Sequence, residues 1–306
     1  MRLSRVATLA LAVGVVAGTI ADRPWRNPPL TLGGYRVLAV DFHTHSSMWS
    51  DGALTPWGLV LEAERQGLDA IAITAHNETW DARVGRRFSR MIGGPVVLVG
   101  EEIARPSYHL IAAGISTTIS FMQSAASAAD DVHRQGGVAI AAHPGRGFWR
   151  GFDLAAMTRL DGWEICHPSV LASESWRDRV QEELEQFAAR RAAPMTAIGS
   201  SDFHGFGPMG LCRTYVFAAD ASEQAILDAV RARRTVVYGR GGRVYGDPSL
   251  VRLAAGAGGF RDREPAREPA GWLDWVSRIG GVAGLAGLAT GRRPRARPAG
   301  PALLVF

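Results

Sequence analysis

Lysine is missing from this chain of 306 residues, and all 34 of its basic side chains are arginine. Together with abundant alanine and glycine, this bias is typical of a bacterial genome of high GC content rather than of a functional demand. Cysteine is scarce too: only Cys166 and Cys212 occur, and neither belongs to a CxxC pair, which leaves zinc ribbons and thioredoxin-like sites without support. We expect both to be buried small hydrophobic residues, and a disulfide between them would require a compartment outside the cytoplasm.

The chain has little net charge to attract a polyanion. Its formal net charge is +5, and part of it is local, because the arginines of residues 292–297 lie together near the C-terminus. We therefore infer no specific nucleic-acid partner. Hydrophobic residues make up 47% and charged residues 21% of the chain, which is ordinary for a globular protein with one large core or two modest ones.

Within the N-terminal residues 1–22, residues 6–21 carry no charge. Two arginines precede an apolar run from Val6 to Ile20, and a small residue follows before the next charge. This is the layout of a signal peptide or of a short membrane anchor, and both interpretations stay open.

The C-terminal residues 272–306 are apolar as well. They begin with Trp272 and Trp275, continue as a Gly- and Ala-rich segment and end in the arginine cluster, an order typical of a membrane-interface segment. Asp274 and Arg278 interrupt the segment, so a membrane-associated helix and a true span both remain open. Residues 256–271 have the composition of a linker.

We expect an exported or membrane-anchored protein that associates with the membrane through one or both termini. Arginines lie outside both apolar segments, which favours an extracytoplasmic position for the domain between them.

Short apolar runs alternate with helical patterns between these ends, over residues 35–255. Most runs are almost continuously apolar, as in parallel strands covered on both faces. The clearest helix signal is Thr55 as N-cap, Pro56 as first helical residue and Gly67 at the end. Some seven βα units predict an α/β fold, either a (β/α) barrel or a doubly wound sheet. The strand candidates are residues 35–42, 69–74, 95–100, 109–114, 138–143, 162–166, 195–200 and 213–218.

Ionisable residues gather where these candidate strands end. Since the carboxyl ends of barrel strands converge on one face, the side chains would meet there and repel when protonated, unless they share cations. Imidazole and carboxylate without thiolate suit zinc, manganese or iron. His109 is an exception because it opens its strand, His133 lies on a helix and is assigned no site, and His167 also follows a strand. The residues at strand ends are His43, His45, His76, Glu101, Glu102, His143, Asp202 and His204.

Five motifs in order resemble the PHP (polymerase and histidinol phosphatase) superfamily of metal-dependent phosphoesterases. They are "DFHTHSSMWSDGALTP", "GLDAIAITAHN", "GEEI", "AAHPGR" and "GSSDFHG", and the resemblance runs from about Val37 to Tyr238. It implies a distorted (β/α)7 barrel of the PHP type, which agrees with the count of strand candidates. The chain is too short for a polymerase role.

The resemblance also implies two or three divalent metal ions, as manganese, zinc or iron. One would be held by His43, His45 and Asp202, a second by the motif glutamate with His109 and His143, and a third by His76, His204 and Asp51. The glutamate should be Glu102, in register with Gly100, with Glu101 as the near alternative.

Two positions depart from the family pattern. The segment between His45 and Asp51 is one residue longer than usual, which leaves open whether two or three ions bind. Ala75 stands where the family commonly has an aspartate, and this predicts altered support for His76.

The activity implied is hydrolysis by a metal-bridging hydroxide, acting on a small phosphomonoester or phosphodiester, with nucleotides among the candidates. Asp202 and His204 would be catalytic, while Arg146 would anchor the phosphate and His167 would contact the substrate. One alternative is a carbamate, carboxylic ester or amide hydrolase on the same centre, because carbamate-ester hydrolases of this superfamily also lack the aspartate. The other is a catalytically silent metal-binding module.

Overall fold

The computed structural model describes residues 2–21, 28–144, 146–168, 182–183, 186–190, 194–205, 207–239, 242–260 and 271–291. The chain divides into two compact units. One combines Met1–Arg23 with Ala266–Phe306, and the other is Pro24–Pro265. Most of the predicted linker, residues 261–270, lies outside the described residues, as does the arginine cluster at residues 292–297.

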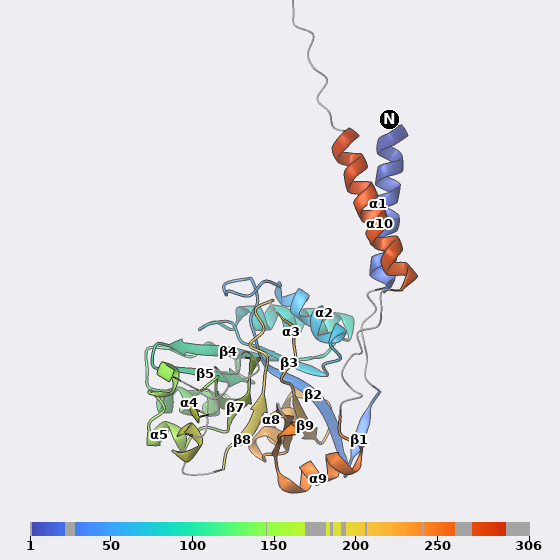
Figure 1. Ribbon diagram of the computed structural model, residues 1–306. Helices are drawn as coiled ribbons and strands as arrows, with labels where there is room; N and C mark the ends of the chain where they lie inside the picture. Colours follow the sequence, from blue (N-terminus) through green and yellow to red (C-terminus); the bar gives the residue numbers. More distant parts are fainter. Residues whose placement is uncertain are drawn as a thin grey trace, which may run out of the picture. The chain divides into compact units, whose positions relative to one another are not determined.

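The first unit is an antiparallel pair of helices, α1 (Arg2–Ala21) and α10 (Trp272–Gly291) (Figure 1). Small residues lie in their contact: Gly14 adjoins the backbone of Gly280 and Gly281. Large apolar side chains point outward, with Ile279 65% exposed. Within the described residues, no helix is long and apolar enough to cross a membrane.

The second unit is built on one sheet in the order β11-β10-β9-β2-β3-β4-β5-β6-β7-β8, with β1 beside β2. All eight predicted strands are present, and their interior residues are buried on both faces, as near-continuous apolar runs require. The strands are β1 (Leu30–Leu32), β2 (Tyr35–Thr44), β3 (Ala70–Ile73), β4 (Val96–Arg105), β5 (Tyr108–Ala113), β6 (Val138–Ala141), β7 (Gly162–Cys166), β8 (Thr196–Gly199), β9 (Thr214–Ala218), β10 (Thr235–Tyr238) and β11 (Val244–Gly246).

The sheet curls into a nearly closed barrel, which confirms the predicted fold. Its first and last segments meet through threonine side chains: Gly199 N–H of β8 donates to Thr214 Oγ1 of β9 at 2.9 Å, and Thr235 Oγ1 of β10 donates to Ala197 O of β8 at 2.9 Å. Cys166 and Cys212 pack beside this closure with Val237, and both are buried and free, as predicted.

The barrel differs from a regular series of βα units, because some of its strands are antiparallel to their neighbours. β5 is antiparallel to both β4 and β6, and β9 is antiparallel to β2. The reason for the first reversal is local, because only two residues separate Arg105 from Tyr108 and a parallel crossover needs a dozen or more.

Helices surround the barrel and close one end. α2 (Pro56–Arg65), α4 (Ala125–Arg134) and α8 (Glu223–Arg231) start at the N-caps Thr55, Ser124 and Ser222, whose side chains accept backbone N–H groups. The sequence did not indicate α3 (Trp80–Ile92), α5 (Leu154–Met157), α9 (Pro248–Gly256) or the 3₁₀ turn η1 (Arg146–Trp149). The sequence pattern of residues 173–192 also predicts a helix, but these residues lie largely outside the described part of the chain.

α8 blocks the amino end of the barrel. Its Ile226, Leu227 and Val230 join the interior cluster formed by inward side chains of the strands. Thr196, at the start of β8, donates its hydroxyl to Val230 O. The opposite end, where most strands finish, is left for polar side chains.

Candidate metal centre

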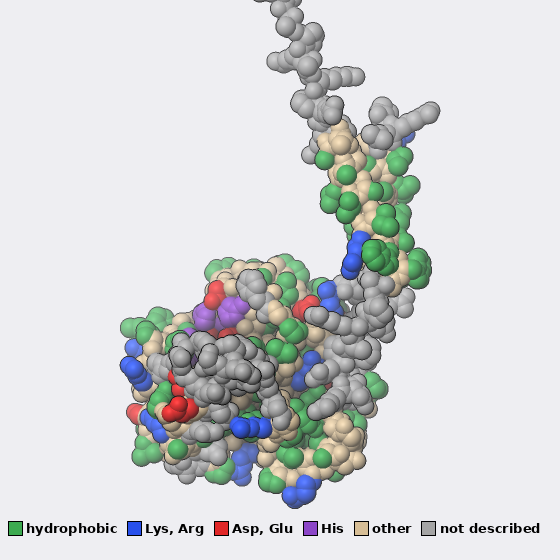
Figure 2. Space-filling view, in the orientation of Figure 1, with side chains coloured by type: hydrophobic (Ala, Val, Ile, Leu, Met, Phe, Trp, Pro, Cys, Tyr) green, Lys and Arg blue, Asp and Glu red, His purple; other side chains and the backbone are tan. Residues whose placement is uncertain are grey.

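All nine predicted metal ligands lie together at the carboxyl end of the barrel strands. In the described residues they form four overlapping groups, and within each group the possible ligand atoms lie within 4.8 Å of one another. Figure 2 shows histidine and acidic side chains reaching the surface side by side on this unit. The groups are His43, His143 and Asp202; His43, His45 and Glu102; Glu102, His109 and His143; and His45, Asp51, His76 and His204.

The reversed direction of β5 explains why His109 belongs to the centre although it opens its strand. An antiparallel strand begins at the edge where its parallel neighbours end. In the β4–β5 pair, His109 stands opposite Ala104, and its Nδ1 lies 2.7 Å from Glu102 Oε1.

Glu102 lies at the middle of the centre, and its two oxygens face different groups. Oε1 is 2.7 Å from His109 Nδ1 and 3.1 Å from His143 Nε2. Oε2 is 3.3 Å from His43 Nε2 and 3.4 Å from His45 Nε2. Burial alone would raise the pKa of Glu102, but the charge of His43 and hydrogen bonds from His109 and His143 hold it well below its ordinary value. One ionised carboxylate therefore lies between two possible ion positions.

Glu101, the alternative to Glu102, points the other way, because successive strand residues alternate in direction. Its Oε1 accepts the N–H of Ile119 at 2.6 Å, and it is absent from the four ligand groups.

Asp202 provides the test of whether cations fit the centre. Its Oδ1 lies 3.2 Å from His43 Nε2 and 3.1 Å from His45 Nε2, yet this buried oxygen makes no hydrogen bond of regular geometry among the described residues. Burial alone would raise the pKa of Asp202, but the charge of His43 and the adjacent imidazoles of His167 and His45 lower it. An ionised oxygen facing two imidazole nitrogens is a donor set that zinc, manganese or iron would complete.

The backbone at two ligands is unusual. Asp202 has φ 47° and His143 has φ 25°, in the region that residues other than glycine rarely adopt. Such conformations persist only when the surroundings enforce them, and they concentrate at functional sites.

Asp51 reaches the outer group despite the longer segment before it. Its carboxylate lies 3.2 Å from His204 Nε2 and 3.5 Å from both His45 Nδ1 and His76 Nε2. The segment folds back tightly, since Gly52 N–H donates to Ser46 O at 3.0 Å. Burial opposes the effect, but the three imidazoles lower the pKa of Asp51.

Ala75 is fully buried, and the support of His76 comes from other residues. The Nδ1 of His76 lies 3.1 Å from Glu102 Oε2, and the Nε2 of His76 faces Asp51. The aspartate that the sequence comparison expected is thus replaced by a methyl group without displacing His76 from its group.

Two buried carboxylates beneath the ligands were not predicted. Asp41 accepts backbone N–H groups from His43, Ser201 and Gly210. Glu164, on β7, contacts His43; burial alone would raise its pKa, but the charge of His43 and its hydrogen bond lower the pKa to about 2. Both are single acids inside apolar strands, a pattern that signals a paired buried charge.

The predicted substrate-binding and catalytic residues are also located. His167 is mostly buried, with Nε2 3.2 Å from Asp202 Oδ2, and His204 belongs to the outer group. Arg146 begins η1 directly beyond the His143 loop, but its side chain lies outside the described residues. The ring of Phe148 packs against that of His109, with the two ring centroids 4.2 Å apart.

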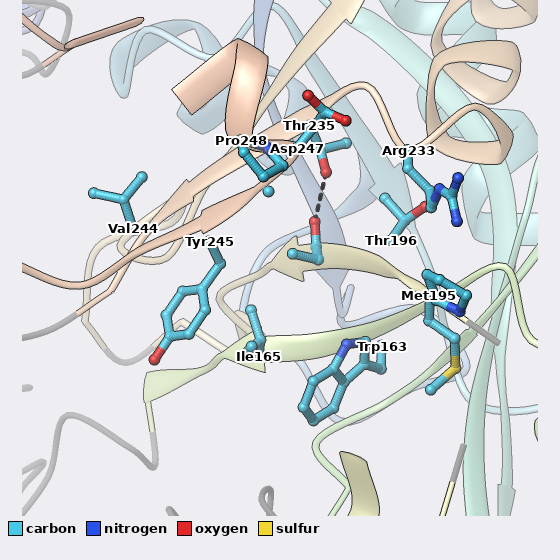
Figure 3. A pocket seen from close by; sticks show the side chains of 13 residues that line it. Trp163, Ile165, Met195, Thr196, Arg233, Thr235, Val244, Tyr245, Asp247 and Pro248 are labelled. Carbon is cyan, nitrogen blue, oxygen red and sulfur yellow. Dashed lines mark hydrogen bonds between the residues drawn. The ribbon is translucent and has the colours of Figure 1, made fainter. Parts of the chain in front are cut away.

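A separate hollow of about 500 Å³ lies outside the barrel, between β7–β8 and β10–β11 (Figure 3). Trp163, Tyr245 and Arg233 line it, and the Thr235 hydroxyl on its wall is already bonded to Ala197 O. None of the nine ligands borders it, so it is distinct from the metal centre.

Comparison with known proteins finds solved structures that resemble the chain. No protein-family model and no curated protein matches the chain. A crystal structure from Bacteroides vulgatus, of a two-domain protein containing a domain predicted to be a PHP-like metal-dependent phosphoesterase, matches with 25% identity and a TM-score of 0.60, over 76% of this chain and 73% of that one.

Two other structures resemble the chain more weakly, both with a TM-score of 0.42. A provisionally assigned metal-dependent phosphoesterase from Bifidobacterium adolescentis is 19% identical over 67% of this chain and 96% of that one. An amidohydrolase from Chromobacterium violaceum, with bound sulfate and no metal, is 18% identical over 56% and 89%. We infer nothing from these two.

The Bacteroides structure, the nearly closed barrel and the ligands at its strand ends agree with one another. The chain resembles a PHP-like metal-dependent phosphoesterase, and it is a metal-dependent hydrolase.

Proposed function

We propose that this hydrolase cleaves a small phosphomonoester or phosphodiester, with nucleotides among the candidate substrates. The observation that supports this most is the position of Glu102, whose two oxygens face two different groups of imidazoles. Two or three cations at such a centre provide the charge that phosphoryl oxygens require. The Bacteroides relative is described as a predicted phosphoesterase of this kind.

Divalent ions held here, as manganese, zinc or iron, would supply hydroxide at neutral pH and neutralise the phosphoryl oxygens. The residues that would hold them are the nine of the four groups. Glu102 keeps two sets of imidazoles at a fixed separation, and Asp202 Oδ1 faces the deeper pair, His43 and His45.

We assign proton transfer to the leaving group to Asp202, with His167 and His204 beside it. Asp202 Oδ2 lies 3.2 Å from His167 Nε2, so a proton can be held between these two atoms beside the reacting oxygen. His204 Nδ1 contacts the backbone oxygen of Asp202 at 2.8 Å, which orients its ring toward the outer group. Arg146, at the start of η1, would bind the phosphate through its guanidinium group.

Turnover of the purified full chain with Mn²⁺ separates the candidate activities. Hydrolysis of p-nitrophenyl phosphate or of its bis-ester, abolished by His43→Ala, is the expected result. Turnover confined to aryl carbamates, carboxylic esters or amides would instead establish the alternative chemistry on the same centre. Full metal occupancy without any turnover would identify a silent metal-binding module.

We also propose that the protein is exported or membrane-anchored, with the barrel on the extracytoplasmic side. The apolar side chains exposed on α1 and α10, such as Leu9 at 65% and Val282 at 70%, support an environment other than water for these helices. Protease added to intact spheroplasts should cleave the barrel unit, and protection of that unit until lysis would contradict the proposal.

A further inference from the structure

Glu164 is a charged residue in a place where charge is costly. It lies in the middle of β7 and is 1% exposed. Its neighbours Trp163 and Ile165 face outward and line the hollow outside the barrel, so the carboxylate points inward, beneath the ligands. A buried carboxylate persists only where donors satisfy it.

The first of these donors is a ligand imidazole. His43 Nδ1 lies 2.9 Å from Glu164 Oε1, while the opposite ring nitrogen, Nε2, faces Glu102 and Asp202. A carboxylate accepts but does not donate, so His43 must carry its proton on Nδ1. Nε2, which faces Glu102 and Asp202, is then the ring nitrogen that an ion at the metal centre would bind.

The second and third donors come from other strands. His143 N–H, at the end of β6, donates to Glu164 Oε2 at 2.5 Å. The Ser200 hydroxyl, directly after β8, donates to Oε1. One side chain on β7 therefore holds the backbone of a second ligand, His143, whose φ of 25° needs enforcement.

We propose that Glu164 is a positioning residue of the metal centre, which fixes the Nδ1–H form of His43 and the strained backbone of His143 so that both present Nε2 to the ions. The inference concerns how this chain prepares its ligands, and it goes beyond the phosphoesterase activity proposed above.

The four ligand groups differ in their dependence on Glu164. His43 or His143 belongs to each of the three inner groups, whereas the outer group of His45, Asp51, His76 and His204 contains neither. Loss of Glu164 should therefore weaken ions of the inner groups and spare an ion in the outer one.

Glu164→Gln is the sharpest change, because it keeps the shape and removes one acceptor. If the amide NH₂ faces His43, it favours a proton on Nε2, the atom needed for the metal; if it faces His143, it opposes the N–H there. Asp161→Asn is the matched control: Asp161 lies just before the same strand and accepts Ala139 N–H at 2.8 Å, far from the ligands along β7.

The experiment titrates the metal-free full chain with Mn²⁺ by calorimetry, without substrate. Glu164→Gln should weaken Mn²⁺ at the inner groups about 10- to 100-fold, the usual effect of removing a partner of a ligand histidine, and Asp161→Asn should leave all affinities unchanged. Asp51→Asn should show the reverse pattern, with loss of the outer ion alone.

A readout of the tautomer distinguishes positioning from stability. In zinc-loaded protein labelled with ¹⁵N-histidine, the Nδ1–H signal that disappears in His43→Ala should be shifted or lost in Glu164→Gln. Unchanged Mn²⁺ affinities and an unchanged signal, with only a lower unfolding midpoint, would overturn the proposal. Because no substrate is used, this result is independent of whether the chain hydrolyses phosphoesters.

Discussion

Asp41 and Gly210 lie 169 positions apart, yet Gly210 N–H donates a hydrogen bond to Asp41 Oδ2 at 2.9 Å. The other oxygen, Oδ1, accepts Ser201 N–H at 3.0 Å and His43 N–H at 3.2 Å. A carboxylate buried on β2 thus holds both ends of the segment that carries Asp202. The ligand-bearing loop is anchored to the strand that carries the first ligands.

Asp41→Asn should destabilise the metal-free chain by about 2 to 4 kcal/mol, because an amide leaves buried N–H donors unsatisfied. Urea unfolding in chelator measures the change. Asp69→Asn is the control, since Asp69 Oδ2 accepts Ala39 N–H in a partly buried position away from the ligand-bearing loop. Equal losses in the two variants would contradict an anchoring role for Asp41.

Much of the fold was predictable from local patterns. The apolar runs identified every strand from β2 to β9, since a strand covered on both faces has no polar side to vary. The direction of β5 was not predicted, because hydrophobic pattern is the same for either direction and only the short turn at residues 106–107 records it. α3 was missed, because its five charged residues among thirteen obscure the apolar stripe.

The candidate site was predictable where motifs carried it and not elsewhere. The histidines in "HTH" and "DFH" can be recognised as metal ligands from their residue type and their position after a strand. Asp41 and Glu164 do not, because their partners are backbone N–H groups and side chains far away in sequence. Substrate preference depends on loops around the open end of the barrel, and the spacing of the motifs does not predict the conformation of these loops.

Gly52→Ala should remove the outer metal ion while the inner ions stay. A Cβ on Gly52 would collide with His45 O, so the segment would have to move and carry Asp51 away from His76 and His204. Mn²⁺ stoichiometry by calorimetry should fall by one ion. Gly256→Ala is a control for the effect of an added methyl group, because a Cβ there meets nothing within 4 Å. An unchanged stoichiometry in Gly52→Ala would mean that Asp51 is not needed for the outer ion.

The ionisation of Glu101 should lower the free energy of unfolding as pH rises. Burial raises the pKa of Glu101 to about 8 from its ordinary value of 4.5, although Ile119 N–H opposes the shift. Between about pH 4.5 and 8 the folded chain retains a proton that the unfolded chain has released, so the free energy of unfolding declines by up to about 1.4 kcal/mol per pH unit.

Glu101→Gln should abolish this decline, because the amide does not titrate. Unfolding in urea, in chelator, should show the variant gaining stability relative to the unsubstituted chain between pH 5 and pH 9. Parallel pH profiles for the two proteins would show that Glu101 is ionised in the folded state.

Phe148→Ala should weaken binding of aromatic substrates, if the chain is a phosphoesterase. Phe148 is 36% exposed, and its ring centroid lies 4.2 Å from that of His109 and 5.5 Å from that of His143. It can therefore stack on an aromatic ring of a substrate at the metal centre. Loss of such stacking should raise KM for bis-p-nitrophenyl phosphate about 3- to 10-fold with little change in kcat.

The KM for methyl phosphate, which has no ring, should not change in Phe148→Ala. Phe121→Ala is the matched control, because Phe121 is 43% exposed and no ring contact in the described chain joins it to a ligand. A KM that rises equally for both substrates would mean that Phe148 positions the ligands rather than the substrate.

Gly280→Leu should separate α1 from α10, whereas Gly281→Leu should not. A Cβ on Gly280 would lie 2.7 Å from Ala10 O and 2.9 Å from Gly14 Cα, while one on Gly281 meets nothing within 4 Å. The two changes add the same side chain to adjacent positions of one helix, so they raise helix propensity equally and differ in the contact between the helices.

Oxidative cross-linking of the full chain carrying Ala7→Cys and Gly287→Cys reports this contact, because a Cβ at position 287 would lie 2.7 Å from that of Ala7. Cross-linking should be efficient in this background and with Gly281→Leu, and it should fall several-fold with Gly280→Leu. Equal yields in the two leucine variants would show that close approach at Gly280 does not hold the pair together. The native Cys166 and Cys212 are buried and can remain in place, since a disulfide between them would not join the two ends of the chain.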